Sequence, residues 1–98
     1  MLYAVILTDS PTADPGLRAA HMADHLAFLE RNADRIRAAG PLTPIGPDVP
    51  GGLWLVEADD PTLIEALIKE DPFWPTGLRS SWLIAQWRQV FADGKRRI

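Results

Sequence analysis

Near its start the chain reads Leu2-Tyr3-Ala4-Val5-Ile6-Leu7-Thr8, an apolar stretch that ends at the turn residues Asp9, Ser10 and Pro11. Its length and composition predict a β-strand. Successive side chains of a strand point to opposite faces, so both faces of this strand are apolar. A strand of this kind must be covered on both sides.

The same two-sided pattern returns in residues 53–58, which read Leu-Trp-Leu-Val-Glu-Ala. We expect a short strand near Leu42, before a loop rich in proline, and a long last strand over residues 80–91. Residues 93–98 form a basic end that we expect to be a mobile tail.

Two helices are predicted between these strands. The first begins with Asp14 as N-cap and Pro15 in the first turn, and Gly40-Pro41 is expected to stop it after Ala39. Its apolar residues recur at helical spacing and predict a buried stripe. The second spans residues 62–70 behind the capping segment 59–61. The predicted stripe consists of Met22, Leu26, Leu29, Ala33 and Ile36, and the predicted core positions of the second helix are Leu63, Ala66 and Leu67.

The order of elements is therefore βαββαβ within a single domain over residues 1–98. This order is typical of an α+β, ferredoxin-like antiparallel sheet with both helices on one face. The apolar residues of the other face then need a cover, and a second copy of the chain is the simplest one. We therefore predict a homodimer.

Composition excludes several function classes. The 98 residues carry a formal net charge of −3, which gives no basic surface for nucleic acid. No apolar run approaches the ~20 residues of a membrane helix. Cysteine is absent, which excludes disulfides and thiolate chemistry and fits a cytoplasmic protein.

Two histidines, His21 and His25, lie four apart on the first predicted helix and so share a face. A metal site is one interpretation, but Met22 stands where a zinc-protease helix needs glutamate, and no third ligand is marked nearby. We therefore predict no metal. His25 lies at the margin of the apolar stripe together with Arg18, where an imidazole is suited either to proton transfer or to a structural role in the core.

Asp71 and the aromatic residues after it are the other candidates. Asp71 precedes a proline and is either a turn residue or a carboxylate that orients a histidine. Phe73 and Trp74 occupy the same loop and are candidates for the wall of a ligand pocket or for an interface. Trp54, Trp82 and Trp87 lie in predicted strands and are interpreted as core or dimer contacts.

Several segments, taken in order, resemble the YciI-like (YCII-related) family, and the resemblance covers nearly the whole chain. Each motif is weak alone, whereas their order and spacing are fairly specific. The matching segments are Met1 to Ile6, His25-Leu26-Ala27-Phe28-Leu29, Ala39-Gly40-Pro41, Trp54 to Ala58, Asp71-Pro72-Phe73, Gly77-Leu78, Trp87 and Val90-Phe91.

The resemblance implies a dimeric α/β barrel and an active site centred on His25 and Asp71, with no cofactor. It implies lyase-like or dehydrohalogenase-like chemistry on small aromatic or carbonyl compounds. Relatives carry an arginine three residues before the histidine, where this chain has Met22. Arg18 or His21 is expected to replace that arginine in binding substrate. The alternative function is a non-catalytic dimeric module that binds a small molecule or an accessory partner.

Overall fold

The sheet has four strands in the order β2-β3-β1-β4, and every neighbouring pair is antiparallel. The computed structural model describes residues 1–98. The ferredoxin-like α+β prediction is confirmed. The elements are β1 (Leu2–Asp9), α1 (Leu17–Arg31), β2 (Ile36–Leu42), β3 (Gly51–Glu57), α2 (Pro61–Glu70), β4 (Arg79–Gln86), β5 (Phe91–Ala92) and β6 (Lys95–Arg96).

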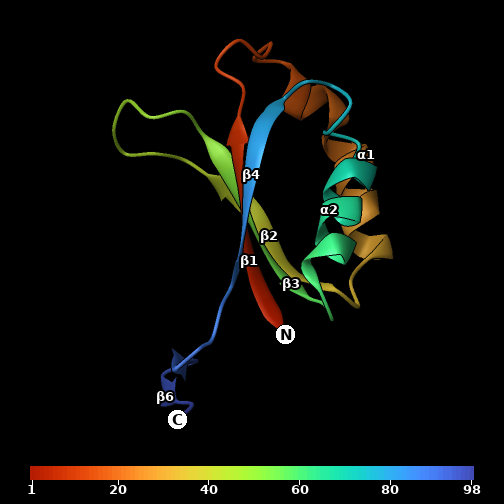
Figure 1. Cartoon of the computed structure of the whole chain (residues 1–98). Coiled ribbons are helices and arrows are strands. Elements are labelled where there is room, and N and C mark those ends of the chain that lie inside the picture. Colours follow the sequence, from red (N-terminus) through yellow and green to blue (C-terminus); the bar gives the residue numbers. More distant parts are fainter.

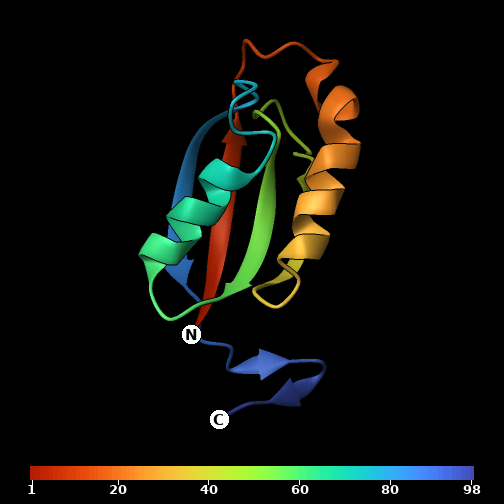
Figure 2. The same cartoon turned by 90° about the vertical axis from the view of Figure 1, so that its right-hand side faces the viewer.

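Both helices cover one face of this sheet, as Figures 1 and 2 show. The core lies between the helices and the sheet. Alternate residues of β1 and β3, such as Val5 and Trp54, are buried there against Phe28 of α1 and Ile64 of α2. Neither helix is long and apolar enough to cross a membrane.

The prediction that the first helix continues to Ala39 is wrong. Helix α1 ends at Arg31, and the Asn32 side chain donates a hydrogen bond of 2.9 Å to the Phe28 carbonyl oxygen. Asparagine is well suited to such a helix end. Ile36 instead begins β2, where it pairs with Val56. Pairing with β3 therefore overrides the helical spacing of the last predicted turns.

The predicted buried stripe of α1 holds only in part, since Leu29 packs against the core and Met22 is partly buried. The buried residues of α1 are His25 and Phe28, whereas Leu26 is 49 % exposed. Ala33 and Ile36 lie beyond the helix.

The bounds of α2 are nearly as predicted. Its buried residues are Ile64, Leu67 and Ile68, whereas Leu63 is partly buried and Ala66 is exposed. The buried face of α2 is therefore apolar at helical spacing, whereas that of α1 is centred on His25 and Phe28.

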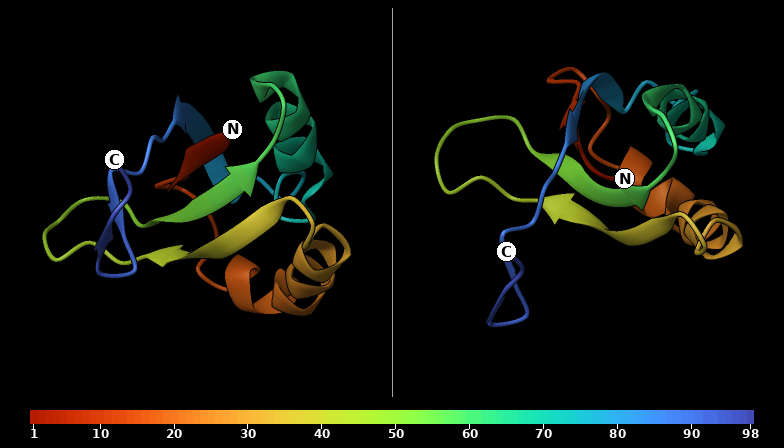
Figure 3. Two further views of the ribbon diagram at one scale, coloured as in Figure 1. Left: turned by 90° about the horizontal axis from the view of Figure 1, so that it is seen from below. Right: turned by 60° about the horizontal axis from the view of Figure 1, so that its bottom comes forward.

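The last predicted strand is also shorter than expected. Strand β4 ends at Gln86, and the residues beyond it form the β5–β6 hairpin. Its turn contains Asp93 and Gly94, both with positive φ, which is the geometry that a tight two-residue hairpin requires. The residues expected to be a tail therefore include strand β6, which lies apart from the main sheet in Figure 3.

Candidate active site

The structure brings His25 and Asp71 together although they are far apart in sequence. His25 projects from the middle of α1, and Asp71 is the residue that ends α2. The distance between His25 Nδ1 and Asp71 Oδ1 is 2.9 Å. His25 is 8 % exposed and Asp71 is completely buried. The hydrogen bond thus links the middle of α1 to the end of α2.

Two further donors fix the Asp71 carboxylate. The backbone N–H of Phe73 donates to Oδ1 at 3.0 Å, and Arg79 Nη1 donates to Oδ2 at 2.6 Å. Burial alone raises the pKa of Asp71, but the hydrogen bonds from His25 and Phe73 and the positive charge of Arg79 outweigh it, so the pKa is lowered. The carboxyl group is therefore ionised at neutral pH.

The ionised carboxylate sets the tautomer of His25. A carboxylate only accepts hydrogen bonds, so we assign the imidazole proton to Nδ1, which donates to Asp71 Oδ1. Nε2 of the neutral ring then keeps its lone pair. The ring of Phe73 packs against the imidazole, with ring centroids 4.4 Å apart, and supports it within the core. This arrangement presents one basic nitrogen in a fixed orientation.

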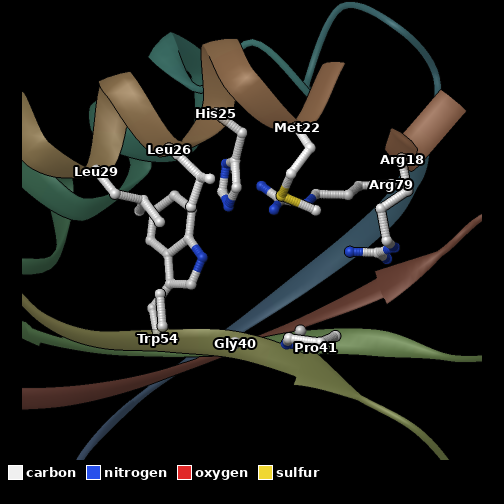
Figure 4. Close-up of a pocket in the computed structure, with 11 residues that line it drawn as sticks. Arg18, Met22, His25, Leu26, Leu29, Gly40, Pro41, Trp54 and Arg79 are labelled. Atoms are coloured by element: carbon white, nitrogen blue, oxygen red, sulfur yellow. The ribbon is translucent and has the colours of Figure 1, made fainter. Parts of the chain in front are cut away.

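A cavity of about 110 Å³ lies between α1 and strands β2 and β3, and His25 is part of its wall. Figure 4 shows the imidazole projecting from the helix toward the sheet. Because a closed cavity of roughly 150 Å³ holds a benzene molecule, the space here limits a ligand to a small molecule of at most one ring. The lining residues are Arg18, Met22, His25, Leu26, Leu29, Ala39, Gly40, Pro41, Gly52, Trp54 and Arg79.

Among the residues predicted to bind substrate, only Arg18 lines this cavity. Phe73 and Trp74, which were predicted to form its wall, are not among the residues that line it. The turn after α2 folds back into the protein, so Phe73 is completely buried behind His25. Trp74 packs edge-on against Trp82, with ring centroids 5.0 Å apart. Phe73 therefore supports His25 from within the core, whereas the ring of Trp74 packs against β4.

His21 is not among the residues that line the cavity, although it lies one turn before His25 on α1. Nowhere in the chain do three or more histidine, aspartate or glutamate side chains form a group that could hold a metal ion. The structure thus separates the two histidines, and only His25 has a carboxylate partner.

Sequence reasoning missed three residues of this region. Arg79 begins β4 and is buried beside Asp71, and Trp54 is both a core residue and part of the cavity wall. Asp9 was interpreted as a turn residue, yet it is buried and its Oδ2 accepts from Arg18 Nη2 at 2.5 Å. The only sequence signal for these two charged residues was their position, since Asp9 is the last residue of β1 and Arg79 is the first residue of β4.

Comparison with known proteins identifies the family and a similar fold. The family model of the YCII-related domain matches residues 1–88. A similar solved structure is that of 5-chloro-2-hydroxyhydroquinone dehydrochlorinase (TftG) from Burkholderia phenoliruptrix AC1100, in complex with 2,5-dihydroxybenzoquinone. It shares 27 % sequence identity with a TM-score of 0.74, over 90 % of this chain and 94 % of that chain. No curated protein matches the sequence.

Proposed function

Because the chain belongs to the family of YCII-related domains, we propose that it is a cofactor-independent enzyme for a small aromatic or carbonyl compound. In this proposal His25 and Asp71 supply acid–base catalysis of a lyase-type or dehydrohalogenase-type reaction. The observation that carries it is the hydrogen bond of 2.9 Å between His25 Nδ1 and a buried carboxylate at the wall of a cavity.

The first chemical step is proton removal by His25. Nε2 takes a proton from a substrate C–H or O–H group, and the Asp71 carboxylate stabilises the imidazolium that forms. The electron pair released in the substrate forms a new π bond, and the leaving group departs with its own bonding pair. The imidazolium then returns its proton to water. The net change is loss of HX, which needs neither oxidant nor reductant.

The similar structure supports this substrate class, because the ligand of that dehydrochlorinase is a one-ring dihydroxybenzoquinone. The cavity of about 110 Å³ limits the ligand to at most one ring. We therefore propose a hydroxylated, halogen-bearing ring, or a carbonyl compound of the same size, as the substrate.

Chloride release from 5-chloro-2-hydroxyhydroquinone tests the proposal directly. His25→Gln should lower kcat/KM by about 10²–10⁴-fold, the usual contribution of acid–base catalysis. Asp71→Asn should lower it too, because a neutral amide stabilises the imidazolium less than a carboxylate does. His21→Gln is the matched control, since this histidine shares the helix but not the cavity. Equal turnover by the His25 and His21 variants would contradict the proposal.

A binding experiment separates the enzyme from the alternative module. Titration with 2,5-dihydroxybenzoquinone should shift the imidazole ¹⁵N resonances of His25 and leave those of His21 in place. If the quinone binds at His25 but the wild type eliminates chloride no faster than His25→Gln, the chain is a small-molecule binding module and not a lyase.

We also infer that the protein is a homodimer that pairs through the open face of the sheet. This face carries no helix, and its neighbouring side chains are apolar: Ile6 pairs with Leu53 on one side and with Leu83 on the other. Leu83 is 59 % exposed. The loop between β2 and β3 and the β5–β6 hairpin both project on this side in Figure 1, so they flank the face that a second copy would cover.

Sedimentation velocity tests the dimer. Leu83→Arg places a charge in the middle of the open face and should convert the protein to monomers, whereas Glu65→Arg on the exposed side of α2 should not. A wild-type protein that sediments as a monomer at micromolar concentration would contradict the inference.

A further inference from the structure

We propose that Arg18 and Arg79 together form an oxyanion site in the cavity, so that the ligand is a small ring bearing a carboxylate, phenolate or enolate oxygen. This inference rests on the proposed function and deepens it by naming the charge of the substrate. Both arginines line the same cavity as His25. In Figure 4 their guanidinium groups lie in the space between α1 and the sheet.

Each guanidinium is held by a carboxylate. Arg18 Nη2 lies 2.5 Å from Asp9 Oδ2, and Arg79 Nη1 lies 2.6 Å from Asp71 Oδ2. These are the only hydrogen bonds that the two side chains make within the protein. A guanidinium carries further N–H donors in a fixed planar arrangement. Each arginine is therefore oriented by one contact and keeps its other donors for a ligand.

The free donors of Arg79 open onto the cavity. Its side chain is only 3 % exposed, so its nitrogens are largely removed from bulk water. The only buried side-chain atom left without a partner in the protein is Asp9 Oδ1, so no nitrogen of Arg79 is sealed inside the core. A charged side chain that is deeply buried and still has accessible, unused donors is a prepared contact for an acceptor.

The two positive charges also act on one another. Both guanidinium groups approach the ring of Phe73, whose centroid lies 5.7 Å from Arg18 Cζ and 5.3 Å from Arg79 Cζ. Burial lowers the pKa of Arg79, and the charge of Arg18 lowers it further, although Asp71 opposes both effects. An anion bound between the guanidinium groups would relieve their repulsion in a site of low dielectric.

The remaining wall explains why the anion should be carried on a ring. Met22, Leu26, Leu29 and Trp54 supply the apolar part of the cavity wall. A free inorganic anion would use the guanidinium groups but leave this apolar surface in contact with water. When His25 removes a proton, negative charge develops on the substrate beside these fixed donors, which is where electrostatic stabilisation contributes most to rate.

The test compares three probes at equilibrium: benzoate, its neutral isostere benzamide, and inorganic phosphate. Affinities come from NMR titration of the wild-type protein. We expect benzoate to bind more tightly than either of the others by a factor of about ten or more, which corresponds to ~1.4 kcal/mol. Arg18→Gln should raise the Kd of benzoate about tenfold and leave the Kd of benzamide unchanged. Arg31→Gln, on the exposed end of α1, is the matched control.

Arg79→Lys provides a second variant, which keeps a positive charge beside Asp71 but lacks the planar donor pair, and it should also weaken benzoate. Benzamide or phosphate binding as tightly as benzoate, benzoate affinity unchanged in Arg18→Gln, or no benzoate binding at millimolar concentration would each overturn the inference. Because these measurements need no turnover, selective benzoate binding stands even if His25→Gln proves that the chain is not an enzyme.

Discussion

Replacing Asp71 by asparagine should destabilise the protein mainly through Arg79. The asparagine carbonyl oxygen can take the place of Oδ1 and keep the bonds from His25 and Phe73. Its amide NH₂ then occupies the place of Oδ2, which accepts from Arg79 Nη1 at 2.6 Å in the native protein. A donor would therefore face a donor. The guanidinium of Arg79, a residue that is only 7 % exposed, would also lose its counter-ion.

Breaking a buried ion pair in this way costs about 3–5 kcal/mol. A domain of this size is stable by only ~5–15 kcal/mol, so the change is a large fraction of the total. With a urea dependence of ~2 kcal/mol per molar, the midpoint of unfolding should fall by about 2 M. The assay is urea denaturation at one fixed protein concentration, with the exposed Asp59→Asn as control.

The double variant Asp71→Asn/Arg79→Met isolates the ion pair. Methionine removes the unpaired charge and fills much of the space, so the double variant should be more stable than Asp71→Asn alone. The reasoning is refuted if Asp71→Asn lies within about 0.5 kcal/mol of the wild type, or if the second substitution adds a full further loss.

Two other predictions concern pH and backbone packing. In the folded protein the pKa of Asp71 lies below its ordinary value of 3.8. Its contribution to stability is therefore complete above pH 3.8 and is lost as the pH falls through the lower folded pKa. Urea titrations in acid should show this fall in the free energy of unfolding for the wild type, and a smaller fall for Asp71→Asn. A Cβ on Gly51 would lie 2.0 Å from the Leu7 carbonyl oxygen. Gly51→Ala should therefore cost ~1–3 kcal/mol in thermal or urea unfolding, whereas Gly46→Ala, with nothing within 4 Å, should be nearly neutral.

Much of the fold is readable from the sequence because its strands and turns carry local signals. Residues 2–8 and 53–58 are short, apolar and bounded by turn residues, and both correspond closely to strands. The end of α1 was not readable in this way. Ile36 continues the helical spacing, and only its pairing with Val56 in another strand decides that it is extended.

The candidate site was only partly readable for a similar reason. His25 and Asp71 stood out by residue type and by resemblance, but nothing local placed them 2.9 Å apart. Arg79 had no motif of its own, and its importance arises from burial beside Asp71. Phe73 belongs to the region as predicted, but a sequence does not show which side of a histidine an aromatic ring will contact.

Side chains alternate along β3 between the two faces of the sheet, which predicts that ligand binding in the cavity does not depend on dimer formation. Trp54 faces the helices and lines the cavity, whereas Leu53 faces the open side beside Ile6 and Leu83. A monomeric Leu83→Arg variant that keeps its circular dichroism spectrum should therefore bind benzoate within roughly a factor of two of the wild type. A loss of binding that accompanies dissociation would mean instead that the partner subunit completes the site, and that the open face and the cavity act as one functional unit.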